Sequence, residues 1–193
     1  MGLAEAVPRF LRDHGKEELA LHVARVAREA RRLAEREGVD PEAAEAAGWL
    51  HDISLVLPYA EMPGLARARG LVLLPEEEQV PALLHGKLSA IIAAESFGVT
   101  DPAVLAAMGC HTTLRAGASP LDQVLFVADK LGWDPADAPY RDGLAAAVER
   151  SLAEGVWFFL AWAWAGRHRM PVIHPWFRAA CEEHLAVSPD TRQ

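Results

Sequence analysis

The chain has 193 residues, of which 51% are hydrophobic and 24% are charged, and this balance excludes a disordered tail or a collagen-like rod. Nineteen Lys and Arg against 27 Asp and Glu give a formal net charge of −8, which argues against a general binder of nucleic acid or anionic membranes. We therefore expect one globular domain whose partner is neither nucleic acid nor a membrane.

Residues 1–10 lack the basic start and the apolar stretch of a secretory signal, which favours a cytoplasmic protein. The two cysteines, Cys110 and Cys181, are too few for a disulfide framework. We interpret both as packing residues.

The composition is rich in Ala, Leu, Glu and Arg, and no β-branched alternation is long enough for a strand, so we predict an all-α fold. Residues 1–15 are expected to form an N-terminal lead-in, residues 16–187 the single domain, and residues 188–193 a loose tail. A first long helix is predicted over residues 16–37, with Gly38 as its stop.

Asp40 and Pro41 predict the cap and the first turn of a second helix, which breaks near Pro58. Prolines, glycines and three consecutive glutamates interrupt the helical period between residues 58 and 81, so we expect short helices and a loop there. Five further helices are predicted, over residues 85–97, 102–111, 120–131, 140–165 and 175–185.

The longest apolar run covers residues 156–165, which is ten residues against the roughly 20 that span a bilayer. We interpret it as a buried helix, and a homodimer contact through it stays open. Its aromatic residues are Trp157, Phe158, Phe159, Trp162 and Trp164.

Five predicted helices each carry a metal-competent side chain on the apolar stripe, where the helical period predicts a core residue. These residues are His22, His51, His85, His111 and Asp129. A single inward histidine is more often bonded to a carbonyl than to a metal, and the His51-Asp52 pair alone is a weak signal. Because each polar group costs several kcal/mol when buried without a partner, the set favours groups that satisfy one another, a metal or an anion. Imidazole with carboxylate, and no thiolate, is typical of iron, manganese or zinc in a hydrolytic site.

The order His, His-Asp, His, His, Asp on successive helices resembles the HD-domain metal-dependent phosphohydrolases, which are single-domain, all-α helical bundles. Flanking residues narrow the resemblance to the YqeK branch, a bacterial family of symmetrical dinucleoside tetraphosphatases that is similar to this chain from about Leu19 to Leu185. The segments that carry the resemblance are 47–52 (Ala-Gly-Trp-Leu-His-Asp), 111–113 (His-Thr-Thr), 127–129 (Val-Ala-Asp) and 173–175 (Ile-His-Pro).

This resemblance implies two transition-metal ions, usually iron, with manganese or another first-row metal also suited to the donors. The first ion would be held by His22, His51, Asp52 and Asp129, and the second by His85, His111 and a bridging Asp52. Two cations that share a carboxylate lower the pKa of water and neutralise phosphate oxygens during in-line displacement. Asp52, His85 and His111 are therefore the candidate catalytic residues.

Three residues are candidates for substrate binding. Arg115, in the segment directly after His111, is the first candidate for a phosphate clamp, because a guanidinium matches phosphate with two parallel hydrogen bonds. Lys87 is the second, and a solvated position is an equal alternative for it. His174 either approaches the nucleotide or, before Pro175, caps the last helix.

Two segments depart from the family's pattern. The family usually has a lysine three residues after the His-Asp pair, where this chain has Leu55. After the last Asp the family tends toward Glu-Pro-Asn-Arg, whereas residues 130–135 read Lys-Leu-Gly-Trp-Asp-Pro, and Arg141 is the candidate to replace the missing arginine. Metal binding is therefore better supported than the identity of the substrate.

The leading hypothesis is hydrolysis of diadenosine tetraphosphate to two ADP, with this small nucleotide as the partner. A phosphohydrolase of another small nucleotide is the alternative that the two departures favour. A non-catalytic module that binds metal and nucleotide is a third hypothesis, against which the complete set of six ligands argues.

Overall fold

The computed structural model describes residues 2–133 and 138–186, and within these ranges it contains eleven α-helices, four short 3₁₀ helices and no strand. The predicted all-α class is therefore confirmed. The expected tail over residues 188–193 lies outside the described residues, as do residue 187 and residues 134–137 of the segment after Asp129.

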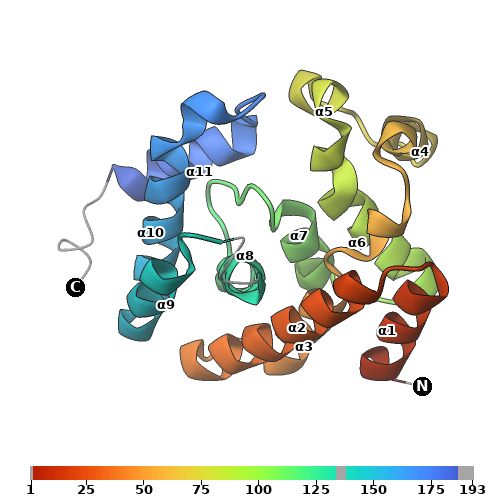
Figure 1. The fold of residues 1–193 in the computed structure, drawn as a ribbon, viewed down its shortest axis with the longest axis horizontal. Helices are drawn as coiled ribbons and strands as arrows, with labels where there is room; N and C mark the ends of the chain where they lie inside the picture. The colour runs from red at the N-terminus through yellow and green to blue at the C-terminus, as the bar shows by residue number, and fades with distance from the viewer. Residues whose placement is uncertain (1, 134–137, 187–193) are drawn as a thin grey trace.

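The helices follow one another along the chain with short connections (Figure 1). The α-helices are α1 (Leu3–Asp13), α2 (Glu17–Glu37), α3 (Pro41–Leu50), α4 (Met62–Ala68), α5 (Pro75–Gln79), α6 (His85–Phe97), α7 (Pro102–Cys110), α8 (Pro120–Gly132), α9 (Arg141–Arg150), α10 (Leu152–Ala165) and α11 (Pro175–Leu185). The 3₁₀ helices are η1 (Ile53–Val56), η2 (Tyr59–Glu61), η3 (Pro81–Leu84) and η4 (Arg167–Arg169). The short helices η2, α4, α5 and η3 confirm the expectation for residues 58–81.

Local capping signals explain where several helices begin and end. Asp40 accepts hydrogen bonds from two backbone amides in the first turn of α3, at 2.9 and 3.2 Å. Ser119 and Asp122 form a capping box at the start of α8. Gly38 ends α2 in the left-handed conformation at φ 69°, which a residue with a Cβ adopts only at an energetic cost.

Helix α8 lies at the centre of the bundle, and Figure 1 shows it end-on between α10 and α7. Its buried residues Val124, Leu125 and Phe126 belong to one apolar cluster that includes residues of α2, α3, α7 and α10. Helices α2 and α3 pack closely at Gly48, where a Cβ would lie only 2.5 Å from the α-carbon of Ala27. Any larger residue at Gly48 would push apart the two helices that carry His22 and His51.

Two elements differ from the sequence expectation. Residues 1–15 contain helix α1, which buries Val7 and Leu11 against α2 even though Pro8 lies inside the helix. The single helix predicted over residues 140–165 is two helices, α9 and α10. They are separated because Ser151 has an extended backbone (φ −167°, ψ 159°) and its hydroxyl caps α10 by accepting a hydrogen bond from a backbone amide of the first turn.

The apolar helix α10 is only partly a core helix. Val156 and Leu160 are fully buried, whereas Trp162 is 40% exposed. Among the described helices, none has both the length and the apolar character that crossing a membrane requires.

Candidate metal centre

Six side chains from five helical regions converge in the interior. His22 comes from α2, His51 caps the end of α3 and Asp52 follows it, His85 begins α6, His111 caps the end of α7, and Asp129 lies in the last turn of α8. The side chain of His85 is 14% exposed, and the other five residues are each at most 6% exposed. The structure therefore brings all six predicted donors to one buried place.

Asp52 lies between two pairs of histidines, and one of its carboxylate oxygens faces each pair. Its Oδ2 is 3.3 Å from Nε2 of His51 and 3.8 Å from Nε2 of His22. Its Oδ1 is 3.2 Å from Nε2 of His85 and 3.4 Å from Nε2 of His111. A carboxylate that bridges two ions requires this placement.

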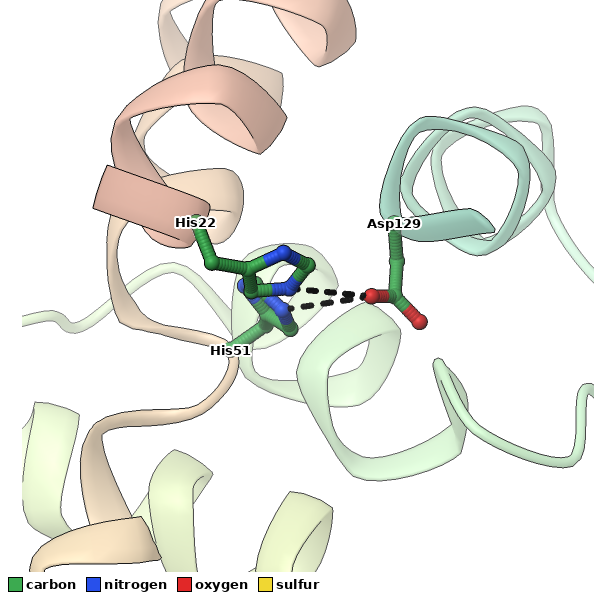
Figure 2. A group of neighbouring side chains, drawn as sticks. All are labelled: His22, His51 and Asp129. Atoms are coloured by element: carbon green, nitrogen blue, oxygen red, sulfur yellow. Dashed lines mark ion pairs between the residues drawn. The ribbon is translucent and has the colours of Figure 1, made fainter. Parts of the chain in front are cut away.

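Asp129 lies close to the first of these pairs. Figure 2 shows His22 and His51 pointing toward the Asp129 carboxylate, whose Oδ1 lies 3.3 Å and 3.6 Å from their Nε2 atoms. The donor atoms of His22, His51 and Asp129 all lie within 4.8 Å of one another, as do those of His51, Asp52 and His111. Ligands of one ion with bonds of roughly 2.1 Å stand about 3–4 Å apart, so this spacing suits metal coordination.

The backbone orients three of the four histidine rings. The Nδ1 atoms of His51, His85 and His111 lie 2.8, 2.6 and 2.8 Å from carbonyl oxygens of the residues three positions earlier. Because a carbonyl only accepts, each Nδ1 carries a proton and donates it. In the neutral ring, Nε2 then carries the lone pair. This lone pair is directed into the cluster, as that of a metal ligand must be.

The cluster contains buried polar atoms that the protein itself does not satisfy. Within the described part of the chain, both ring nitrogens of His22, Nε2 of His51 and Oδ1 of Asp52 are buried without a hydrogen-bond partner. Nε2 of His85 and Nε2 of His111 stand 3.0 Å apart, although each presents a lone pair in its neutral form. Facing lone pairs repel each other unless a proton or a metal cation lies between them, so this donor set fits metal ions.

Protons compensate the buried carboxylates where a cation is lacking. Burial lowers the pKa of His51, but the charges of Asp52 and Asp129 outweigh that effect and raise this pKa to about 10. Burial lowers the pKa of His111 to about 4. Although burial opposes it, attraction to His51 holds the pKa of Asp52 well below its usual range. A metal that binds here would therefore displace a proton from His51.

Two residues at this centre were missed by sequence analysis. The buried ammonium of Lys130 donates to Oδ2 of Asp129 at 2.8 Å and to the carbonyl of His111 at 2.6 Å. Neighbouring residues on a helix point in different directions, so the position of Lys130 next to Asp129 in the sequence did not predict this contact. The hydroxyl of Thr112 lies 3.1 Å from Nε2 of His85 and 3.2 Å from Nε2 of His111, and the His-Thr-Thr segment contained that signal.

Each of the three predicted substrate contacts has a partner within the protein. Arg115 donates through Nε and a terminal nitrogen to Oδ2 of Asp122, at 3.1 and 2.8 Å. Nζ of Lys87 lies 2.6 Å from Oε1 of the buried Glu77. Nε2 of His174 is 3.5 Å from the same oxygen, and its Nδ1 caps α11 by accepting a hydrogen bond from the backbone at 3.1 Å. The capping alternative for His174 is therefore confirmed.

The two residues that depart from the family's pattern differ in exposure, since Leu55 is half-buried and Trp133 is exposed. Leu55 packs against a small apolar cluster that includes Leu84 and Leu88. The ring of Trp133 is 46% exposed and lies against His22, with 4.6 Å between the ring centroids. Arg141 donates to the carbonyl of Leu131 at 3.0 Å, so it reaches the end of α8.

An apolar pocket of about 280 Å³ lies beside the six donors. Its walls include Phe159, Trp162, Phe177 and His174. Thr112 also lines it, and because the Thr112 hydroxyl contacts the rings of the second histidine pair, the pocket adjoins that end of the centre.

Comparisons with known proteins agree with this geometry. The family model of the HD domain matches residues 19–134. A protein of Lactococcus lactis subsp. cremoris, described as an uncharacterized protein in the pepC 5′ region, is 37% identical over 69% of this chain and 68% of its own length. The symmetrical bis(5′-nucleosyl)-tetraphosphatase of Bacillus subtilis is 34% identical over 56% of this chain and 58% of its own length. A crystal structure from Clostridium acetobutylicum, described as a predicted HD superfamily hydrolase involved in NAD metabolism, covers 94% of this chain and 96% of its own with a TM-score of 0.87 and 25% identity.

A helical bundle around a buried group of histidines and aspartates defines the class of HD-type, metal-dependent phosphohydrolases. This chain belongs to the HD-domain family, because the family model covers more than half of it. It is an HD superfamily hydrolase related to the symmetrical tetraphosphatases, and its match spans 58% of the Bacillus subtilis enzyme.

Proposed function

We propose that this protein hydrolyses the central phosphoanhydride bond of diadenosine tetraphosphate and releases two ADP. The observation that carries the proposal is Asp52, whose two oxygens face two separate histidine pairs. That arrangement supports a site for two metal ions on a phosphate chain. The similarity to the symmetrical tetraphosphatase of Bacillus subtilis supports the choice of substrate.

In this proposal the six donors would hold two ions, with iron as the expected metal and manganese as the alternative. His22, His51, Asp52 and Asp129 would hold the first ion, and His85, His111 and Asp52 the second. A bound pair of cations lowers the pKa of water and offsets the negative charge that develops on phosphate oxygens.

The protein's own contribution is to fix the ligands and to bind the phosphate chain. Backbone carbonyls orient three histidine rings, and Lys130 holds the Asp129 carboxylate in place while it compensates its charge. If the Nε2 lone pairs of His85 and His111 were bound to metal, the hydroxyl of Thr112 beside them would be free to donate a hydrogen bond to a phosphate oxygen.

The surroundings of the centre support specific substrate contacts. The aromatic pocket beside Thr112 suits a nucleoside at one end of the phosphate chain. Arg115 is the proposed phosphate clamp, because its side chain is 37% exposed and, although Asp122 pairs with Nε and one terminal nitrogen, the other terminal nitrogen is left to donate to phosphate. His174 lines that pocket directly, and Lys87 is linked to it through their shared contact with Glu77.

A phosphohydrolase of another small nucleotide is the second candidate function. Leu55 favours it, since an apolar side chain that packs against Leu84 and Leu88 stands where the family resemblance implies a lysine. Loss of one positive charge near the site weakens the attraction for a long, highly charged phosphate chain.

The deciding experiment is chromatography of the products formed from diadenosine tetraphosphate and a panel of mononucleotides, with iron, manganese or cobalt supplied. ADP as the only product from the dinucleotide supports the proposal, whereas ATP with AMP contradicts symmetrical cleavage. Cleavage of mononucleotides alone supports the second candidate. Absence of turnover with every metal overturns both candidates and favours a non-catalytic module. The Asp52→Asn variant is the control for contaminating activity.

A further inference from the structure

A second pocket, of about 290 Å³, lies between α2, α9 and the C-terminal end of α8. Four arginines line it: Arg25, Arg28, Arg32 and Arg141. The three on α2 are spaced three and four residues apart, so they form one stripe of the helix. A gathering of guanidinium groups is unexpected in a chain with a net charge of −8.

Two of these arginines are anchored by the backbone of α8. Nε of Arg25 donates to the carbonyl of Gly132 at 2.8 Å, and Nε of Arg141 donates to the carbonyl of Leu131 at 3.0 Å. Both carbonyls belong to the last turn of α8, whose negative end attracts cations. Each bond uses only Nε and fixes the plane of the guanidinium group. The terminal nitrogens are then left as oriented donors at the pocket.

The charges of the pocket are not balanced by its own carboxylates. Arg32 is held by Glu29 through two hydrogen bonds of 3.0 and 2.6 Å, so this pair is neutral. Among the described residues of the lining, Glu149 is then the one other carboxylate, against Arg25, Arg28 and Arg141. Within the described residues Arg28 makes no hydrogen bond or ion pair, and it is exposed. Three neighbouring guanidiniums with one carboxylate attract an anion.

The pocket adjoins the metal centre through Gly132. Gly132 lines the pocket, and a Cβ on it would stand 3.5 Å from Cε1 of His22. Arg25 lies one turn of α2 beyond His22. An anion in the pocket would therefore lie beside the His22 end of the centre, whereas the apolar pocket adjoins the end with His85 and His111.

We propose that Arg25, Arg28 and Arg141 form a binding site for the phosphate chain of a nucleotide. A guanidinium group binds phosphate through two parallel hydrogen bonds, and an arginine whose guanidinium is already anchored loses little conformational freedom on binding. Two sources share this chemistry: the far half of the substrate held at the metal centre, and a separate nucleotide that binds here alone. The first source rests on the proposed function, and the second does not.

The test is calorimetric titration of the full-length protein, treated with a chelator to remove metal, with inorganic tripolyphosphate. Arg28→Ala should weaken binding about fivefold and Arg28→Glu about tenfold or more, because each removes a charge-assisted contact. Arg36→Ala is the control, since Arg36 lies on the same helix and pairs with Glu37 outside the pocket. Thermal unfolding of each variant checks the fold. No binding by the wild type, or equal binding by Arg28→Glu, overturns the proposal.

Kinetics of the manganese-loaded protein with diadenosine tetraphosphate separate the two sources. If the far half of the substrate occupies the pocket, Arg28→Glu raises KM and leaves kcat nearly unchanged. If a separate nucleotide binds there, KM is unchanged and the variant abolishes any effect of added tripolyphosphate on the rate. Arg28-dependent binding without turnover supports the anion site and contradicts the proposed function, whereas turnover without such binding does the opposite.

Discussion

Two buried groups of histidine and carboxylate reach helix α6, and they differ in whether an ammonium of the protein lies against the central carboxylate. Around Asp52, buried nitrogen and oxygen atoms lack hydrogen-bond partners within the described residues, and two imidazole lone pairs face each other at 3.0 Å. Around Glu77, the ammonium of Lys87 lies 2.6 Å from one carboxylate oxygen and a backbone amide donates to the other at 2.9 Å. His174 completes the second group at 3.5 Å.

This comparison shows that burial of a histidine beside a carboxylate does not by itself mark a functional site. The Glu77 group contains a carboxylate and an ammonium, so its charges cancel within the fold, and it links α5, α6 and the start of α11. The Asp52 group keeps donor atoms directed at one another, and its central carboxylate has no ammonium of the protein beside it, so a proton on His51 or a bound cation compensates its charge. The first group therefore has the properties of a structural element, and the second those of a binding site.

The sharpest way to break the comparison is Asp52→Ala. Because one carboxylate faces both histidine pairs, its loss should remove bound metal and lower turnover by at least about 10³-fold, with helical content unchanged. Elemental analysis and circular dichroism measure the two effects. Asp13→Ala, on the surface, is the control. Full retention of metal by Asp52→Ala would contradict the bridging role.

The Glu77 group should respond in stability rather than in metal content. Glu77→Gln leaves the ammonium of Lys87 without its partner and should reduce the free energy of unfolding by about 3–5 kcal/mol. Glu78→Gln is the control, since Glu78 pairs with Arg67 on the surface and such pairs contribute about 1 kcal/mol or less. Chemical denaturation provides the measurement. Loss of metal with unchanged stability would assign Glu77 to the metal centre instead.

The stability that the Glu77 group contributes should depend on pH in the acid range. Burial raises the pKa of Glu77, but His174, a backbone amide and Lys87 outweigh this and lower it from 4.5 to about 2. A depressed pKa contributes stability that is complete above pH 4.5 and is lost as the pH falls toward 2, by at most about 3 kcal/mol. Denaturation at pH 6 and at pH 3 should show a smaller loss of stability for Glu77→Gln than for the wild type. An equal loss in both proteins would contradict this assignment.

Lys130→Met tests how far the Asp52 group depends on its neighbours. The ammonium of Lys130 holds the Asp129 carboxylate and the carbonyl of His111, so its removal should weaken metal binding about 10- to 100-fold without abolishing it. Competition with a metal-binding dye measures this affinity. Lys16→Met, in the exposed turn before α2, is the control. Unchanged affinity in Lys130→Met would leave the lysine with a packing role alone.

Arg115→Ala is expected to have the smallest effect. As a phosphate clamp it should raise KM about three- to tenfold with metal content and kcat nearly unchanged. Arg150→Ala removes an arginine–carboxylate pair that lies on the surface, with Glu154, and serves as the control. If KM is unchanged while stability falls, the contact with Asp122 is the whole role of Arg115.

Much of the fold was predictable because its signals are local. Asp40, Ser119 and Gly38 act on backbone groups within four residues of themselves, and the helical period identified the stripes that became the core. The prediction was wrong over residues 140–165, where the local N-cap at Ser151 divides the expected helix in two. It also did not describe helix α1, which forms around Pro8 because it buries Val7 and Leu11.

The sequence by itself determined which side chains face inward, because the helical period assigns a donor to the buried face of its own helix. It does not specify which side chain of another helix lies opposite. Only the tertiary structure decided which donors meet. The bond from Arg25 to Gly132 joins residues 107 positions apart, and Lys87 pairs with Glu77 across two helices. Such pairings depend on how helices pack, a property of the whole chain that no window of neighbouring residues contains. For the same reason, the two faces of Asp52 became visible only when α3, α6 and α7 were in place.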